Sequence, residues 1–416
     1  MSGKAVVVGG GIVGLCSAFY LSEWGWDVTV LERGKLADAG TSHGNAGLIV
    51  PSHFVPLASP GTLRLGMRLM WNPAGPLGIR PSAEMARWSL LFRRAATAGH
   101  VERVSPLIRD LNLESRRLYK VLANDLGWQD MPKIAGLTVV ANKEQTVHEL
   151  HHLVDQAVSF GLEAQKLDDL LLRHRLGPVE ANSPGGAWFG CDGHLDPGIV
   201  MARLAGFLQA RGIRFFEGCD VDTVHHNGHR ISRVEAGGLS FEADEYVFAA
   251  GVWTGRLAGQ LRIDLPLVPG KGQHMDLAKP PVELNGPILL EDARVAVTPL
   301  GGGSVRFAGT MELGAWSSKV NPRRLAGMRR SIGGVLPQFR GKLEQAATWS
   351  GLRPCLPDGL PAVGRAGGFS NLFVATGHAM MGMSLGPVTG LAVAETLSGA
   401  KPTVPIHALS PERFTR

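Results

Sequence analysis

Residues 6–14 read VVVGGGIVG, so an apolar, β-branched run leads directly into Gly9, Gly11 and Gly14 in GxGxxG spacing. The first glycine allows a tight turn, the second lets a pyrophosphate approach the backbone, and the third lets the next helix pack closely on the strand. The N-terminus of that helix presents unpaired N–H groups and a positive dipole end to phosphates. The segment therefore predicts a dinucleotide-binding turn.

The residues after this turn complete a βαβ unit. LCSAFYLSEW, residues 15–24, predicts the helix, with Gly25 just past its end. A second strand, DVTVLE, covers residues 27–32 and ends on Glu32. About 20 residues beyond the glycines, a carboxylate can accept hydrogen bonds from both ribose hydroxyls of an adenosine. This context favours a bound nucleotide over a glycine-rich turn without a ligand.

Composition narrows the class of protein. With 416 residues, the chain predicts two domains. The formal charge of +6 is not concentrated in one tract, which argues against nucleic acid as a partner. Four cysteines without a CxxC pair fit a reducing cytosol and argue against a disulfide framework or a structural zinc. Because the N-terminus reads as a strand, no signal peptide is expected and the predicted location is cytoplasmic.

One apolar stretch allows two interpretations. Residues 371–394 carry no formally charged residue and are long enough to cross a bilayer. The turn residues Thr376, Gly377 and His378 interrupt the stretch, and NLFVAT reads better as a strand. The favoured interpretation is a strand, a glycine turn and a helix that begins near Ser384 with Pro387 in its first turn. The helix N-terminus would stabilise negative charge on a reduced ring system.

The segment from Thr62 to Arg94 is basic and amphipathic. It contains six arginines and one glutamate, interspersed with large apolar residues that include Met70, Trp71 and Trp88. Two interpretations stay open: a solvated helical face over the core, or a patch that lies on an anionic membrane surface.

His148, Glu149 and His152 satisfy the HExxH pattern of zinc hydrolases. The apolar stripe of the predicted helix is formed by Val147, Leu150, Val154 and Ala157, so the two histidines fall on its polar side. No third ligand is evident, and we predict a solvated helix face without a metal.

Arg353 stands out in SGLRPCLPDGLPAVG because it precedes Pro354 and so lies on extended or turn backbone. Its planar, five-donor guanidinium suits bidentate capture of a substrate carboxylate. An ordinary ion pair is the alternative at this stage.

These residues identify a resemblance to the FAD-dependent D-amino acid dehydrogenases, within the broader D-amino acid oxidase and glycine oxidase group. The resemblance spans essentially the whole chain. No single motif is specific to the family, but their order and spacing are. The matching segments are VVVGGGIVGLCSAFYL with Glu32, SHGNAGLI at 42–49, VPGKG at 268–272, WSGLRPCLPDGLPAVGR at 349–365, NLFVATGH at 371–378, GMSLGPVTG at 382–390 and LSPERFTR at 409–416.

The resemblance implies an α/β fold: a Rossmann-like FAD domain of the glutathione-reductase type and a discontinuous α+β substrate domain with an antiparallel sheet. We assign residues 1–60, 197–262 and 343–416 to the FAD domain and residues 61–196 and 263–342 to the substrate domain. The FAD is expected to be noncovalent. The expected cofactor-binding residues are Gly9, Gly11, Gly14, Glu32, Arg33, Ser42, Asn45, Ala46, Gly47, Val221, Ala250, Gly251, Gly377, Gly382, Met383 and Ser384.

The implied reaction is oxidation of a D-amino or cyclic imino acid, with hydride transfer from Cα to flavin N5. Arg353 is expected to bind the carboxylate, with His43 and His378 as further catalytic candidates and His53 and Gln273 as further substrate contacts. The implied electron acceptor is a quinone or a dye, and some family members attach to the inner membrane surface. The alternatives are an oxygen-using oxidase of the D-hydroxyproline, proline, glycine or sarcosine type, or the flavin subunit of a heteromeric dehydrogenase. The sequence leaves the side-chain preference and the oligomeric state open.

Overall fold

The computed structural model describes residues 3–38, 40–69 and 72–415. Its first sheet has six strands in the order β19-β20-β13-β1-β2-β9. The pairs β1–β2, β1–β13, β13–β20 and β2–β9 are parallel, and β19 is antiparallel to β20. The strands are β1 (Lys4–Val8), β2 (Asp27–Glu32), β9 (Arg214–Glu217), β13 (Glu245–Phe248), β19 (Ala362–Arg365) and β20 (Leu372–Thr376).

The second large sheet has nine strands in the order β18-β14-β17-β16-β15-β5-β7-β6, with β4 paired to β17. Most of its pairs are antiparallel. Its strands are β4 (Leu77–Ile79), β5 (Leu137–Ala141), β6 (Ala164–Asp168), β7 (Gly185–Phe189), β14 (Val268–Leu277), β15 (Ile288–Leu290), β16 (Val295–Pro299), β17 (Val305–Leu313) and β18 (Ala347–Cys355). The predicted combination of a parallel nucleotide-binding sheet with an antiparallel one is confirmed.

Within the described residues, two small sheets and ten α-helices accompany these large sheets. The small sheets contain β3 (Leu48–Ile49) with β8 (Gly193–His194), and β10 (Val221–His226), β11 (Ile231–Ala236) and β12 (Leu239–Phe241). The helices are α1 (Ile12–Glu23), α2 (Pro60–Leu69), α3 (Ala83–Ala95), α4 (Ala98–Asp125), α5 (Glu144–Ser159), α6 (Asp169–Leu176), α7 (Pro197–Ala210), α8 (Thr254–Gln260), α9 (Pro322–Val335) and α10 (Gly382–Leu397).

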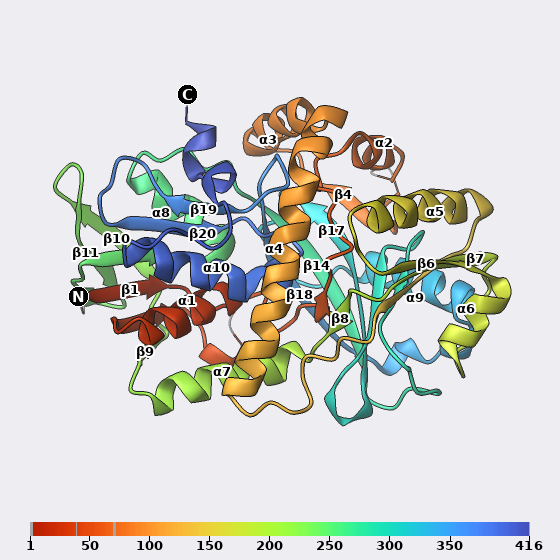
Figure 1. Cartoon of the computed structure of the whole chain (residues 1–416). Helices are drawn as coiled ribbons and strands as arrows, with labels where there is room; N and C mark the ends of the chain where they lie inside the picture. Colours follow the sequence, from red (N-terminus) through yellow and green to blue (C-terminus); the bar gives the residue numbers. More distant parts are fainter. Residues whose placement is uncertain (1–2, 39, 70–71, 416) are drawn as a thin grey trace.

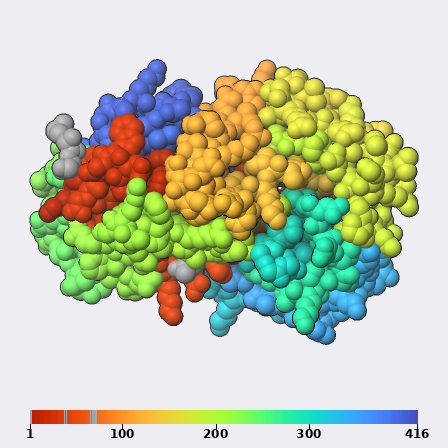
Figure 2. All heavy atoms as spheres, turned by 60° about the horizontal axis from the view of Figure 1, so that its bottom comes forward, coloured from red at the N-terminus to blue at the C-terminus, as the bar shows by residue number. Residues whose placement is uncertain are grey.

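The two large sheets occupy different halves of the molecule, with α4 running across the middle (Figure 1). On the face in Figure 2, the red and green segments gather on one side and the yellow and cyan segments on the other. Two elements cross the predicted domain boundaries. Helix α4 packs on α1 and α10 in one apolar core, and β18 pairs with β14 in the nine-stranded sheet. The division into two domains stays a prediction.

Residues 371–394 form a strand, a turn and a helix, as the sequence favoured, but the helix starts earlier than predicted. Helix α10 begins at Gly382, so Pro387 lies inside it and not in its first turn. A proline has no N–H and leaves the carbonyl four residues earlier without its helical partner. Here the Tyr119 hydroxyl donates to the Met383 carbonyl at 2.6 Å, which compensates for the proline. Among the described residues, no helix has both the length and the apolarity to cross a membrane.

Helix α5 carries the HExxH pattern and buries the stripe that the sequence predicts: Val147, Leu150, Val154 and Ala157. In the described ranges, no group of three or more His, Cys, Asp or Glu side chains is placed to hold a metal ion. In the basic segment, Met70 and Trp71 lie outside the described residues, whereas Trp88 is buried and stacks on Phe92.

Candidate functional site

Five parallel strands of the six-stranded sheet end at the same edge, and four of them lead into predicted cofactor residues. Because β20, β13, β1 and β2 are parallel, their carboxyl ends lie together. The residues that follow them are Gly377, Ala249 to Gly251, Gly9 and Arg33. The strand order reverses at β1, because β2 and β9 are added on one side of it and β13 and β20 on the other. Ligands of open α/β sheets bind at such a switch point. Predicted cofactor residues from four distant parts of the sequence therefore meet at one edge.

The glycines of the turn are required by close backbone contacts. Gly9 has φ +110°, and a Cβ there would lie 2.5 Å from the Ala249 carbonyl oxygen. A Cβ on Gly14 would lie 1.8 Å from the Gly9 carbonyl oxygen. At the N-terminus of α1, the Ser42 hydroxyl accepts a hydrogen bond from the Ile12 amide at 2.9 Å. The turn is therefore a bare backbone surface, as a pyrophosphate requires.

Glu32 is buried at the end of β2, and its two carboxylate oxygens bind the glycine turn and the segment after β2. Oε2 accepts from the Gly10 amide at 2.7 Å, and Oε1 accepts from the Gly34 amide at 2.8 Å. Each oxygen keeps a second lone pair, which leaves acceptor capacity for ribose hydroxyls.

Other predicted cofactor residues surround this edge. The Thr376 hydroxyl donates to the Gly251 carbonyl at 2.8 Å, which ties the segment after β13 to β20. The Arg33 guanidinium lies 3.4 Å from the centre of the Trp253 ring. Val221 is buried, and its carbonyl accepts from Arg256 at 2.9 Å.

The segment Ser42–Gly47, called here the flavin loop, connects this edge to α10. The Asn45 side-chain oxygen accepts from the Gly47 amide at 2.8 Å, and Gly47 has φ +79°. Just after the loop, the Val50 amide donates to the Ser384 hydroxyl at 3.1 Å. Ser384 in turn donates to Asn112 of α4 at 2.6 Å, and the N-terminus of α10 at Gly382 has no side-chain cap.

Arg353 lies on β18 in the nine-stranded sheet and pairs with Gly270 of β14. Its guanidinium lies across the next glycine on that face, because a Cβ on Gly272 would be 2.2 Å from the Arg353 Cζ. Nη1 donates to the Thr310 carbonyl at 2.8 Å. Among the described residues, no carboxylate forms an ion pair with Arg353. Burial lowers the pKa of Arg353, and a desolvated cation of this kind is stabilised by an anionic ligand.

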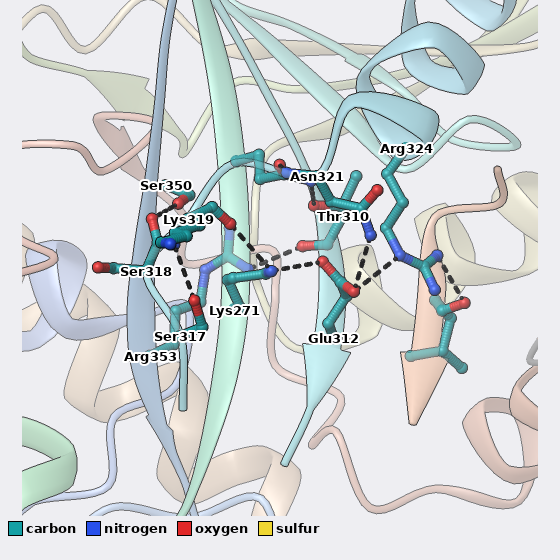
Figure 3. A network of polar contacts seen from close by, with 12 residues as sticks. Lys271, Thr310, Glu312, Ser317, Ser318, Lys319, Asn321, Arg324, Ser350 and Arg353 are labelled. Carbon is teal, nitrogen blue, oxygen red and sulfur yellow. Dashed lines mark hydrogen bonds and ion pairs between the residues drawn. The ribbon is translucent and has the colours of Figure 1, made fainter. Parts of the chain in front are cut away.

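On the opposite face of the same strands lies a buried ionic cluster (Figure 3). Glu312 of β17 pairs with Lys271 at 3.1 Å and with Arg324 at 3.3 Å. Burial alone would raise the pKa of Glu312, but hydrogen bonds from Lys271 and Asn321 and the nearby cations lower it. Both cations of this cluster therefore have a carboxylate partner, in contrast to Arg353.

Gln273 also lies on this opposite face. Side chains alternate along β14, and Gln273 is three positions from Gly270, the partner of Arg353. Its amide group contacts the Thr310 hydroxyl at 3.4 Å and accepts from the Asn321 amide. The structure does not bring the Gln273 side chain to the face of Arg353, and a substrate contact by it stays a prediction.

The candidate histidines are placed differently from one another. His43 is partly exposed, with Nδ1 4.0 Å from an Asp38 carboxylate oxygen. His378 follows β20 and forms a bridge with Cys355, two residues from Arg353. Its ring points to α10, where Nε2 lies 3.0 Å from the Thr389 hydroxyl. Burial lowers the pKa of His378 to about 4, so this ring is neutral near pH 7.

His53 belongs to a buried polar group that the sequence did not suggest. Its Nδ1 lies 3.2 Å from the Ser52 hydroxyl, which donates to Asp192. The Ser52 amide also donates to Asp192, at 2.9 Å. Burial lowers the pKa of His53 to about 4, with the charge of Arg294 as a second cause. Burial raises the pKa of Asp192 to about 7.

We expect Asp192 to make stability depend on pH. In the unfolded chain its pKa is about 3.9. Between about pH 4 and the folded-state pKa of about 7, the folded state holds a proton that the unfolded state has lost, so stability falls as the pH rises. The loss is on the order of 2–4 kcal/mol. Urea unfolding of wild type and Asp192→Asn at pH 5 and pH 7.5 measures it.

Asp155→Asn is the control for this prediction, because Asp155 is an exposed carboxylate paired with Lys166. The Asp192→Asn variant should lose less stability than wild type and Asp155→Asn over this pH interval. Equal pH dependence in all three proteins would contradict the prediction.

A largely parallel sheet with a GxGxxG turn at its carboxyl edge, next to a second, mostly antiparallel sheet, defines a dinucleotide-binding protein. The family model described as FAD dependent oxidoreductase matches residues 4–396. The D-amino acid dehydrogenase of Bradyrhizobium diazoefficiens is 31% identical over 422 residues, which cover 99% of each protein. The D-amino acid dehydrogenase of Methylobacterium sp. (strain 4-46) is 31% identical over 428 residues, with the same coverage.

Solved structures agree on the fold. Glycine oxidase from Geobacillus kaustophilus superposes on this chain with a TM-score of 0.79 at 22% identity. The superposition covers 100% of this chain and 99% of the glycine oxidase chain. The L-amino acid deaminase from Proteus myxofaciens gives a TM-score of 0.76 at 17% identity, covering 100% of this chain and 94% of its own. The chain belongs to the family of FAD-dependent oxidoreductases. The predicted resemblance, the fold and the cofactor FAD are thereby confirmed.

The site residues fit FAD on the geometry described above. Glu32 is placed for the adenosine ribose, the bare turn from Gly9 to Gly14 for the pyrophosphate, and the flavin loop for the part of the cofactor beyond it. The individual contacts stay predictions.

We expect Glu32→Ala to weaken FAD binding by roughly 5- to 150-fold, which corresponds to 1–3 kcal/mol for lost charge-assisted hydrogen bonds. Titration of apoprotein with FAD measures the change. Glu32→Gln, which keeps one oxygen acceptor, should lose less affinity. Flavin released by denaturation should be unmodified FAD. Undiminished affinity in Glu32→Ala, or flavin that stays with the precipitate, would contradict these expectations.

Sequence reasoning missed several residues around the site. Thr310 has φ +61° and offers its carbonyl to Arg353. Asp276, His274 and Arg306 contact one another or the flavin loop, although they come from β14 and β17. The sequence did contain one signal for such contacts, the glycines of VPGKG and WSGLRP. A glycine in a strand leaves room for a large side chain on the same face of the sheet, as Gly272 does for Arg353 and Gly351 does for Trp349.

Proposed function

We propose that this enzyme oxidises D-amino acids, including cyclic imino acids, and that Arg353 binds the substrate carboxylate. The observation that carries the proposal is the guanidinium of Arg353, which is desolvated, lies over Gly272 and has no carboxylate partner among the described residues. The similar D-amino acid dehydrogenases support the same substrate class.

The chain's own residues supply orientation and not proton transfer in this proposal. FAD, when bound, supplies the hydride acceptor. Arg353 has one nitrogen engaged with the Thr310 carbonyl and keeps its other donors for the carboxylate. Two-point binding at one end of a small substrate fixes the direction of its Cα hydrogen. No side-chain base is required when the amine reacts in its neutral form, and the neutral His378 ring is held by Thr389.

A panel of D-, L- and cyclic amino acids tests the substrate class. Flavin bleaching under anaerobic conditions should occur with D-alanine, D-proline or a related D-substrate, and not with the L-enantiomers. Bleaching by L-amino acids alone would overturn the proposal. Activity of the isolated chain with a dye acceptor would count against the alternative of a flavin subunit that works only in a heteromeric complex.

We propose that the electron acceptor is a quinone or dye and not oxygen. Support comes from the name dehydrogenase carried by the similar curated proteins. Steady hydrogen peroxide production at the rate of substrate oxidation would identify an oxygen-using oxidase instead.

We further propose that α3 contacts an anionic membrane surface. Arg87, Leu90, Arg93 and Arg94 are exposed on this helix, and half of the Leu90 surface is accessible. A surface cavity of about 390 Å³ lies beside them, between α3 and Phe414. An apolar side chain among arginines is typical of peripheral attachment to lipid headgroups.

We expect the protein to float with anionic vesicles at low salt and to detach at high salt, because exposed charges are screened over about 10 Å at 0.1 M salt. Leu90→Glu should reduce flotation. Leu170→Glu is the control, since Leu170 is exposed on α6, away from the arginines of α3. If the protein stays at the bottom of the gradient at both salt concentrations, then α3 is only a solvent-exposed helix and the proposed membrane contact is wrong.

A further inference from the structure

Arg306 connects the nine-stranded sheet to the flavin loop. It is buried on β17 and pairs with Asp276 of β14 through two hydrogen bonds, from Nε at 2.9 Å and from Nη2 at 2.8 Å. Its remaining nitrogen, Nη1, donates to the carbonyls of His43 and Asn45 at 3.0 and 2.8 Å. The carboxylate therefore fixes the plane of the guanidinium, and the guanidinium fixes two carbonyls of the loop.

The carbonyl between these two is held from the same sheet. His274 of β14 places Nδ1 3.0 Å from the Gly44 carbonyl oxygen, and because a carbonyl only accepts, Nδ1 carries the hydrogen. The His274 ring stacks on Trp349 of β18, with 5.0 Å between ring centres. Trp349 also covers Gly44, where a Cβ would be 2.4 Å from its ring. Three strands thus hold three consecutive peptides.

The orientation of these peptides sets the direction of their N–H groups. In a trans peptide the carbonyl and the following N–H point in opposite directions. With the carbonyls of His43 and Asn45 on Arg306, the amides of Gly44 and Ala46 point away from the nine-stranded sheet. In the part of the chain that the structure describes, neither amide donates to another protein group, whereas the Asn45 amide donates to the Ser42 carbonyl at 3.1 Å.

We propose that Arg306 is a positioning residue: held by Asp276, it orients the amides of Gly44 and Ala46 as a pair of hydrogen-bond donors for the flavin half of FAD. The loop begins at Ser42, which accepts from the Ile12 amide at the N-terminus of α1, and the chain after it reaches α10, where the Val50 amide donates to Ser384. Glu32, the residue expected at the adenosine, binds the amides of Gly10 and Gly34 instead. Preorganised donors cost no ordering when the ligand arrives, so the clamp contributes to cofactor affinity. This inference rests on the FAD site and not on the identity of the amino acid substrate.

Arg413 offers a matched control for Arg306. Its Nε and Nη2 bind Asp358 at 2.7 and 3.3 Å, and its Nη1 donates to the carbonyls of Leu409 and Ser410 at 2.8 and 3.0 Å. The same pattern of bonds thus occurs in the C-terminal segment, away from the flavin loop. Arg413 Nη2 also donates to the Leu360 carbonyl at 2.9 Å, so Arg413→Met removes the same kinds of interaction as Arg306→Met and one more.

The experiment measures the affinities of apoprotein for FAD and for ADP, which carries the pyrophosphate but no flavin. Arg306→Met should raise the Kd for FAD by about tenfold or more while changing that for ADP by less than about threefold. Arg413→Met should leave both within about threefold of wild type. Arg306→Lys, which can keep the pairing with Asp276 but cannot span two carbonyls, should give an intermediate loss of FAD affinity.

Three results would overturn the proposal: unchanged FAD affinity in both Arg306 variants, an equal loss of affinity for ADP, or the same loss in Arg413→Met. If Arg306→Met does not fold, Arg306→Lys alone tests the proposal. Its loss of affinity for FAD should then exceed its loss of affinity for ADP. No amino acid is present in these titrations, so they stand apart from the test of the proposed substrate.

Discussion

Replacing Arg353 with lysine is expected to lower kcat/KM for a D-amino acid by roughly 10- to 150-fold, which corresponds to 1.5–3 kcal/mol for a charged hydrogen-bond pair. Lysine keeps the charge but loses the planar fork that binds both carboxylate oxygens. The loss should appear as a higher KM and slower flavin reduction. FAD content should not change, because Arg353 lies on β18 of the nine-stranded sheet and not at the glycine turn.

Stopped-flow flavin reduction with D-proline and D-alanine measures this effect, and amines of the same shape without the carboxylate are the control. These amines should reduce the flavin of wild type and of Arg353→Lys equally slowly, because an amine without a carboxylate cannot bind the guanidinium. If the two proteins reduce at the same rate with the amino acids, then Arg353 is a structural residue that holds Thr310, and the carboxylate is bound elsewhere.

Replacing Gly14 with alanine is expected to abolish FAD binding at micromolar cofactor, a loss of at least about 100-fold in affinity. The added Cβ would lie 1.8 Å from the Gly9 carbonyl oxygen. That oxygen belongs to the backbone of the turn, so the clash is relieved only if α1 moves away from β1, which removes the pyrophosphate surface. Titration of apoprotein with FAD measures the loss, and thermal unfolding should show a lower Tm.

Gly206→Ala is the control for this change, because Gly206 also lies inside a helix, α7, and a Cβ there meets nothing within 4 Å. Alanine should raise helix stability by up to about 1 kcal/mol at this position and leave FAD affinity unchanged. A Gly14→Ala protein that retains stoichiometric FAD would show that the turn rearranges without cost, contrary to the close packing described here.

The sequence predicts the glycine turn well because each of its requirements is local. Gly9 needs a positive φ, Gly14 needs the absence of a Cβ, and Glu32 needs only to end the next strand. The apolar stripe of α5 is predictable for the same reason, since a helix repeats every 3.6 residues whatever it packs against.

Contacts between distant strands could not be predicted in this way. Strand pairing places the Gln273 side chain on the face opposite Arg353, and the sequence did not indicate this. The start of α10 also depends on a distant residue, because the Tyr119 hydroxyl from α4 takes the carbonyl that Pro387 leaves free. Neither result follows from residues near in sequence.

By itself, then, the sequence determined the dinucleotide turn and the βαβ unit around it, and its motifs pointed to an arginine for a carboxylate, since backbone conformation and periodicity act over a few residues. The tertiary structure decided the electrostatics. Whether Arg353 has a counterion, whether Asp192 is desolvated, and whether Arg306 reaches the flavin loop all depend on which strands the fold brings together. Desolvation and hydrogen-bond geometry are properties of that three-dimensional surrounding and not of a residue's place in the chain.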